Sequence, residues 1–259
     1  MLLAIDIGNT NIVLGVFEGR ALGRSWRLAT ARERTGDELG LMITDLLDRA
    51  GIKPAAIDGV VMASVVPQLT GPMIDMSLRY LGLTPVNVDA DTDIGMPNLY
   101  AHPAEVGADR LVNGLAAWER YGRERAVPLI VVDFGTATTF DAISARGEYL
   151  GGVICPGVQI SADALFQRAA RLPRVDVRKP ASVIGRTTVT SMQSGLFFGY
   201  VAMVEGLVHR LRSELGGTAF CVATGGLADV ISPETDVVDA VDRDLTLQGL
   251  RMVWERLKK

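Results

Sequence analysis

The chain has 259 residues, a hydrophobic content of 48% and a formal net charge of −4. The acidic balance and the lack of a long basic run argue against a nucleic-acid-binding protein, and no apolar stretch is long enough to cross a membrane. Because Cys155 and Cys221 cannot build a disulfide framework, we expect a cytoplasmic protein.

The first half of the chain opens with strands and continues with alternating helices and strands. Short apolar runs bounded by turn residues predict strands, whereas apolar residues three and four apart predict helices. The predicted strands are 2–5, 12–17, 25–28, 59–63 and 85–88, and the predicted helices are 36–50, 67–81 and 103–121. Their order along the chain is βββαβαβα.

The second half repeats the opening pattern of three strands. The predicted strands are 129–133, 139–144, 149–154, 219–223 and one within 236–241, and the predicted helices are 157–170, 189–215, a short one after 224–226, and 245–257. No Ser/Gly-rich linker separates the two halves. We therefore expect an α/β fold of two duplicated units, residues 1–122 and 123–259.

Each half begins with a strand that ends in Asp-x-Gly, followed by small polar residues and a returning strand. The two segments are Asp6-Ile7-Gly8-Asn9-Thr10-Asn11 and Asp133-Phe134-Gly135-Thr136-Ala137-Thr138. Tight turns of this kind present backbone N–H groups to phosphate without side-chain interference. The alternative is two ordinary hairpins, but the repeated Asp at a strand end favours a duplicated nucleotide-binding unit. A P-loop sequence is absent, so a P-loop kinase is excluded.

Two carboxylates have the chemistry that phosphoryl transfer needs. Asp6 is a candidate ligand for Mg²⁺, which binds few carboxylates and retains waters. Asp109 lies early in the helix expected from residue 103, where Gly107 and Ala108 leave room for a substrate. A carboxylate there can accept the proton of an attacking hydroxyl. The alternative is an N-terminal helix Asp that is favoured by the helix dipole and paired with Arg110.

The repeated element order and the paired Asp-x-Gly turns resemble the actin, hexokinase and Hsp70 ATPase superfamily, which is built from ribonuclease H-like units. Within it, the segments 6–11, 107–110, 133–138, 151–157 and 192–195 together resemble type III pantothenate kinase. The resemblance implies an actin-like ATPase fold. It also implies ATP-dependent phosphorylation of pantothenate to 4′-phosphopantothenate, the first step of coenzyme A biosynthesis.

The resemblance also implies roles for individual residues. It assigns the general base to Asp109, and it gives Asp133 a monovalent cation, K⁺ or NH₄⁺, beside the Mg²⁺ that accompanies ATP. The implied ATP-binding residues are Asp6, Ile7, Gly8, Asn9, Thr10, Asn11, Ile12, Val13 and Thr136. The implied pantothenate-binding residues are Tyr100, Gly107, Ala108, Asp109, Arg110 and Thr188.

Two segments leave alternatives open. Relatives carry Asn where this chain has Thr187, which affects the expected shape of the substrate pocket. The segment Thr224-Gly225-Gly226 resembles the adenosine-side loop of the superfamily, but Gly-Gly after a strand is equally typical of an ordinary turn.

The long helix expected at 189–215 favours a homodimer. Its apolar residues cover more of its surface than one buried face needs, and Gly195 and Gly199 would let another helix approach closely. The resemblance implies a dimer with the substrate pocket at the subunit boundary. Two other functions stay open: a nucleotide-binding regulatory or accessory protein on the same fold, and a kinase for another small alcohol.

Overall fold

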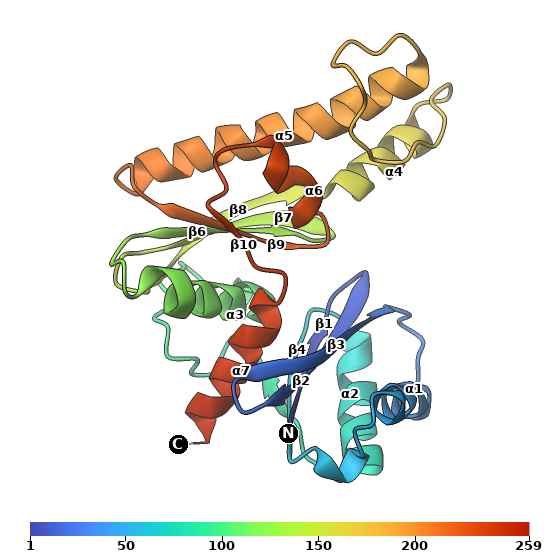
Figure 1. The fold of residues 1–259 in the computed structure, drawn as a ribbon, viewed down its shortest axis with the longest axis vertical. Coiled ribbons are helices and arrows are strands. Elements are labelled where there is room, and N and C mark those ends of the chain that lie inside the picture. The colour runs from blue at the N-terminus through green and yellow to red at the C-terminus, as the bar shows by residue number, and fades with distance from the viewer. Residues whose placement is uncertain (259) are drawn as a thin grey trace. The chain divides into compact units, whose positions relative to one another are not determined.

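Two five-stranded sheets, each with its own helices, make up the computed structural model, which describes residues 1–258 (Figure 1). The chain forms two compact units: unit 1 is Met1–Ala116 with Asp244–Lys259, and unit 2 is Ala117–Arg243. Contacts within the chain therefore group the C-terminal helix with the first half, whereas a division in chain order at residue 122 would place it with the second.

The sheet of unit 1 has the strand order β3-β2-β1-β4-β5. Strands β1 and β2, and β2 and β3, pair antiparallel, while β4 and β5 add in parallel to β1. The strands are β1 (Leu2–Ile7), β2 (Asn11–Glu18), β3 (Ala21–Ala29), β4 (Gly59–Ser64) and β5 (Val86–Val88). The helices are α1 (Gly36–Arg49), α2 (Pro67–Met76), α3 (Ala108–Ala117), which ends at the boundary of unit 2, and α7 (Leu245–Leu257). Short helical segments are η1 (Pro54–Ala56), η2 (Ser77–Leu81) and η3 (Pro103–Glu105).

The sheet of unit 2 repeats this topology, with the order β8-β7-β6-β9-β10 and the same pattern of antiparallel and parallel pairs. Its strands are β6 (Leu129–Phe134), β7 (Ala137–Ile143), β8 (Tyr149–Pro156), β9 (Phe220–Gly225) and β10 (Ala240–Val241). Its helices are η4 (Trp118–Gly122), α4 (Val158–Arg168), α5 (Thr188–Glu214), α6 (Ala228–Ile231) and η5 (Ser232–Glu234). The predicted duplicated α/β fold is confirmed.

Strand alternation decides where the two motif aspartates lie. In β1, Leu3, Ile5 and Ile7 belong to the core that α1 and α2 build on one face of the sheet. In β6 the corresponding residues pack under α5. Because successive side chains point to opposite faces of a strand, Asp6 and Asp133 lie on the other face of their sheets. Each is the fifth residue of its strand.

The helix expected at 103–121 is broken into three pieces, which corrects the sequence prediction. A 3₁₀ turn, η3, ends at Val106 in an extended conformation; α3 begins at Ala108, and the helix continues as the π-helical η4. Asp109 is thus the second residue of a new helix. Among residues 1–258, no helix combines the length and the apolar character needed to cross a bilayer.

Candidate active site

The first turn of unit 1 is held by backbone and side-chain hydrogen bonds. The N–H of Gly8 donates to the carbonyl of Asn11 at 2.9 Å, and the Thr30 hydroxyl donates to the carbonyl of Gly8 at 2.7 Å. The N–H of Thr30 donates to the carbonyl of Thr10 at 2.9 Å. Asn9 and Thr10 are exposed at the tip. The turn is therefore a fixed, solvent-facing loop, which suits a phosphate cradle.

The predicted ATP-binding residues of unit 1 divide into two groups. Asp6, Gly8, Asn9, Thr10, Asn11 and Val13 are at least partly accessible. Ile7 and Ile12 are completely buried in the core, so any contact that they make with a nucleotide must use their backbone. Asp6 lies opposite Val13 on β2 and Ala63 on β4, two apolar neighbours. Mg²⁺ is typically held by one or two carboxylates and keeps several water ligands, so a half-buried carboxylate beside a polar turn fits this ion.

Asp109 is held at the start of α3 by its two neighbours. Its Oδ1 accepts the backbone N–H of Arg110 at 2.8 Å. A Cβ atom at Gly107 would lie only 2.5 Å from the same oxygen, so position 107 cannot carry a side chain without moving the carboxylate. Burial raises the pKa of Asp109 above its ordinary value of 3.8, although the hydrogen bond and the charge of Arg110 offset part of the shift.

The other predicted pantothenate-binding residues of unit 1 do not all lie beside Asp109. Ala108 and Arg110 are buried, and Gly107 is partly exposed. Tyr100 is partly exposed in the loop before η3, where its N–H donates to the side chain of Asn98 at 3.1 Å. The structure therefore brings Gly107, Asp109 and Arg110 into direct contact and leaves Tyr100 on a separate loop of the same unit.

The second turn is shorter than expected and lies against a helix start. Strand β7 resumes at Ala137, so only Gly135 and Thr136 form the exposed connection. A Cβ atom at Gly157 would lie 2.2 Å from the carbonyl oxygen of Thr136, which shows how closely the start of α4 approaches the turn. Inside, the hydroxyls of Thr138 and Tyr200 are hydrogen-bonded, which ties β7 to α5.

Asp133 has hydroxyl residues on both neighbouring strands. It lies opposite Thr139 on β7 and Thr224 on β9. A Cβ atom at Gly225 would lie 2.5 Å from Asp133 Oδ1, so backbone borders the carboxylate closely there. Oxygen donors of this kind suit a hard monovalent cation. Thr139 is not among the site residues expected from the sequence. The expected strands 129–133 and 139–144 nevertheless place Thr139 directly opposite Asp133, which is the register that the structure has.

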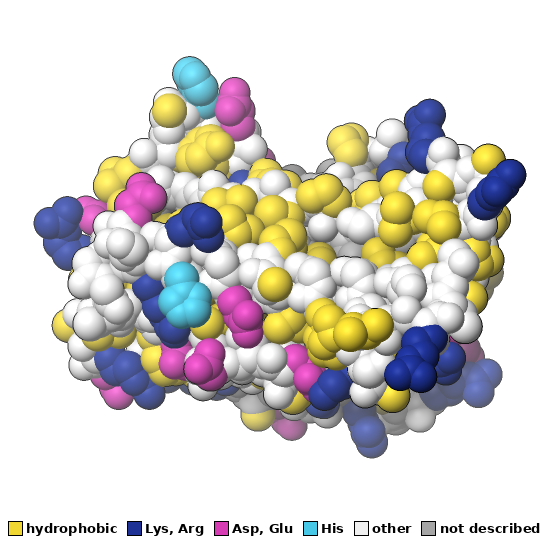
Figure 2. Space-filling model, turned by 90° about the horizontal axis from the view of Figure 1, so that it is seen from above, with side chains coloured by type: hydrophobic (Ala, Val, Ile, Leu, Met, Phe, Trp, Pro, Cys, Tyr) yellow, Lys and Arg dark blue, Asp and Glu magenta, His cyan; other side chains and the backbone are white. Residues whose placement is uncertain are grey.

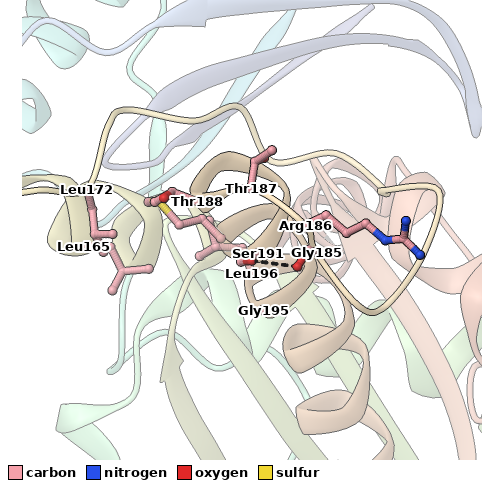
Figure 3. Close-up of a pocket in the computed structure, with 10 residues that line it drawn as sticks. Leu165, Leu172, Gly185, Arg186, Thr187, Thr188, Ser191, Gly195 and Leu196 are labelled. Atoms are coloured by element: carbon pink, nitrogen blue, oxygen red, sulfur yellow. Dashed lines mark hydrogen bonds between the residues drawn. The ribbon is translucent and has the colours of Figure 1, made fainter.

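Thr188 is the first residue of α5, and it lines a pocket of about 860 Å³ in unit 2. Leu165 and Leu172 lie on one side of it, and the Arg186 side chain extends away from them (Figure 3). Thr187 is the N-cap of α5, and its hydroxyl accepts the N–H of Thr190 at 3.2 Å. Because Thr and Asn both cap helices well, the departure from Asn at position 187 is compatible with this geometry.

Comparisons with known proteins show sequence similarity along nearly the whole chain to curated relatives that share one description. The family model described as type III pantothenate kinase matches residues 2–210. The type III pantothenate kinase of Moorella thermoacetica is 53% identical over 256 residues, which cover 99% of this chain and 99% of that protein. The one from Myxococcus xanthus is 52% identical over 256 residues, covering 99% and 98%.

Solved structures share the fold at low sequence identity. A Campylobacter jejuni protein described as a conserved putative Baf family transcriptional activator has a TM-score of 0.61 at 18% identity, covering 99% of this chain and 98% of its own. An inorganic polyphosphate/ATP-glucomannokinase from Arthrobacter sp. strain KM has a TM-score of 0.53 at 16% identity, covering 100% and 99%. These likenesses establish the actin-like ATPase fold alone.

Proposed function

The chain belongs to the type III pantothenate kinase family, and we infer that residues at the ends of β1 and β6 and at the start of α3 perform its reaction. It transfers the γ-phosphoryl group of ATP to pantothenate and forms 4′-phosphopantothenate, the first step of coenzyme A biosynthesis. The sequence alone left two other functions open, a kinase for another small alcohol and a regulatory protein. Family membership favours pantothenate phosphorylation over both.

Asp109 is the proposed general base, and its geometry is the observation that carries the assignment. Its carboxylate is fixed by the N–H of Arg110 and by the bare backbone of Gly107. Burial raises its pKa, so the ionised form is a stronger base than an exposed Asp. It accepts the proton of the primary hydroxyl as that oxygen attacks the γ-phosphorus. Arg110 is the proposed partner of the pantothenate carboxylate, because a guanidinium matches that group well.

The two turns are the proposed ATP contacts. In the first turn, Gly8–Asn11 contact ATP through their backbone and polar side chains. In the second turn, the contact is made by Thr136, which is exposed. The reaction uses ATP together with a divalent metal ion, as in other kinases. Asp6 is the proposed ligand of that metal ion. Bound metal neutralises charge on the phosphates during transfer. Asp133 is the proposed ligand of K⁺ or NH₄⁺, because the paired threonines and the close approach of Gly225 fit an oxygen-coordinated ion.

A homodimer is the proposed working unit, with Thr188 serving a substrate pocket at the subunit boundary. Four small residues follow one another along the exposed side of α5: Ser191, Gly195, Gly199 and Ala202. Nearby apolar side chains are also exposed, namely Ile160, Phe166, Val183, Ile184 and Val189. Figure 2 looks onto the side of the molecule where α5 lies in Figure 1 and shows many hydrophobic side chains at this surface. Such a surface suits a second copy of the chain.

A cytoplasmic location is proposed as well, since the two cysteines are free thiols. The experiment that tests the function measures ADP release from ATP and Mg²⁺ with pantothenate, with controls that omit pantothenate or replace it by another small primary alcohol. Mass spectrometry of the product should show a phosphomonoester of pantothenate. ADP release at the same rate without pantothenate would contradict the proposed roles.

A further inference from the structure

The hydroxyl of Thr139, which lies opposite Asp133, is tied to a buried carboxylate. Thr139 Oγ1 donates to Asp141 Oδ2 at 3.2 Å, and the Tyr149 hydroxyl donates to Asp141 Oδ1 at 2.7 Å. Asp141 and Tyr149 are both completely buried. All three residues belong to unit 2, on β7 and at the first position of β8.

These contacts fix the direction of the Thr139 hydroxyl. A threonine hydroxyl has one proton and two lone pairs. When the proton is donated to Asp141, only lone pairs remain for other partners, and the oxygen acts purely as an acceptor. Directly opposed residues on antiparallel strands have Cβ atoms about 5 Å apart. The Thr139 oxygen and the Asp133 carboxylate can therefore face one cation together.

The corresponding sheet of unit 1 is built without this buried carboxylate. Asp6 occupies the same place in β1 that Asp133 occupies in β6. Its neighbours across the sheet are Val13 and Ala63, where unit 2 has two threonines.

The comparison extends to Asp141 itself. Two residues beyond Val13 lies Gly15, whereas two residues beyond Thr139 lies Asp141. A Cβ atom at Gly15 would lie 2.8 Å from Leu247 Cδ1, so apolar packing takes that place in unit 1. Burying a carboxylate costs free energy unless it is hydrogen-bonded, so its presence in only one unit calls for a local reason.

We propose that Thr139, Asp141 and Tyr149 form a relay that turns the Thr139 oxygen toward the monovalent cation held by Asp133. The inference rests on the proposed role of Asp133. Asp141 and Tyr149 are positioning residues, because they act through Thr139 and not on the ion itself. Outer partners that orient a metal ligand typically change metal affinity by roughly 10- to 100-fold when removed.

The test compares Thr139→Val, Thr139→Ser, Asp141→Asn and Tyr149→Phe with the wild type. The K⁺ concentration for half-maximal activity is measured in choline chloride at constant ionic strength. Binding is measured separately by thallium(I) NMR and by the rise in the thermal midpoint on adding KCl. Ser144→Ala is the matched control, because it removes a hydroxyl that donates to Glu148 at 2.7 Å in the turn of the same hairpin.

We expect Thr139→Val and Asp141→Asn to raise the K⁺ requirement by roughly tenfold or more and to weaken thallium binding equally. Thr139→Ser keeps the hydroxyl, so its K⁺ requirement and thallium binding should be those of the wild type. Ser144→Ala should also match the wild type. Normal K⁺ affinity in Thr139→Val, with loss of K⁺ dependence in Asp133→Ala, would overturn the relay and leave the role of Asp133 standing. A wild type that works equally well in Na⁺ and K⁺ would overturn both.

Discussion

The backbone of Gly107 and the carboxylate of Asp109 are so close that a Cβ atom at 107 would lie 2.5 Å from Asp109 Oδ1. Real Cβ atoms do not approach an oxygen this closely, so the glycine is what allows the carboxylate to occupy its position. The same oxygen accepts the N–H of Arg110. The segment Gly107–Arg110 thus works as one unit that aims the proposed base.

Asp109→Asn should lower turnover by roughly 10²- to 10⁴-fold, the usual range for loss of a general base. The folded protein should be as stable as the wild type or more stable at neutral pH. A carboxyl whose pKa is raised by folding disfavours the folded state once pH exceeds that pKa, and Asn removes this penalty. Steady-state kinetics and thermal denaturation check the two parts.

The control for this substitution is Glu105→Gln, which alters an exposed carboxyl in the preceding 3₁₀ turn. It should leave turnover unchanged. Near-normal turnover in Asp109→Asn at saturating ATP and pantothenate would refute the assignment of the base.

The acid side of the pH profile should report Asp109. Because burial raises its pKa above 3.8, kcat/KM should fall on acidification with a midpoint above that value. The base is active when ionised, so the rate is lost as pH falls through the raised pKa and not as it rises. The limb is measured as kcat/KM for pantothenate over the pH range in which the protein stays folded. A midpoint at or below 3.8 would contradict the shift.

Gly157→Ala should weaken ATP binding. The new Cβ would meet the carbonyl oxygen of Thr136 at 2.2 Å, and both groups are backbone-anchored, so the turn itself must move. We expect KM for ATP to rise by about tenfold, equivalent to ~1.4 kcal/mol, with a smaller change for pantothenate. Gly71→Ala in α2 is the control, since nothing lies within 4 Å of the added atom there. An unchanged KM for ATP in a folded Gly157→Ala variant would argue against the second turn as an ATP contact.

The sequence predicted the two sheets well because their strands are local signals. Apolar runs that end in Asp-x-Gly identify β1 and β6 together with the turns that follow them. The break before α3 was missed because Pro103 is typical of a helix start, and the sequence does not distinguish a 3₁₀ turn from the first turn of an α-helix.

Long-range packing was less accessible to sequence reasoning. Leu247 of α7 packs where a Cβ of Gly15 would lie, which associates the C-terminal helix with the first sheet, and no local pattern encodes that choice. Likewise, the motif 6–13 identifies a turn but does not separate accessible residues from Ile7 and Ile12, whose side chains complete the core. The turn between β6 and β7 spans residues 135–136, three residues fewer than the expected 134–138, although the pairing of Asp133 with Thr139 agrees with the expected strand ends.

The last prediction concerns the dimer, and the structure changes how it should be tested. Phe198 is a poor site for a charge because it packs against the core of unit 2 and meets Phe197 edge to face with ring centroids 5.4 Å apart. Gly199 is better, since it is exposed on α5 and a Cβ atom added there would have nothing within 4 Å. Glycine is about 1 kcal/mol less favourable than alanine inside a helix, so Gly199→Glu should not destabilise the separate chain.

In a dimer that packs along the small residues of α5, however, Gly199→Glu would bury two unpaired carboxylates at the interface. We therefore expect light scattering to show monomers, thermal denaturation to show a folded chain, and pantothenate phosphorylation to be lost, because Thr188 stands at the start of the same helix. Leu41→Glu is the matched control: it adds the same charge at an exposed position of α1 and should remain dimeric and active. A Gly199→Glu protein that stays dimeric, or a wild type that is monomeric and fully active at assay concentration, would rule out this surface as the interface.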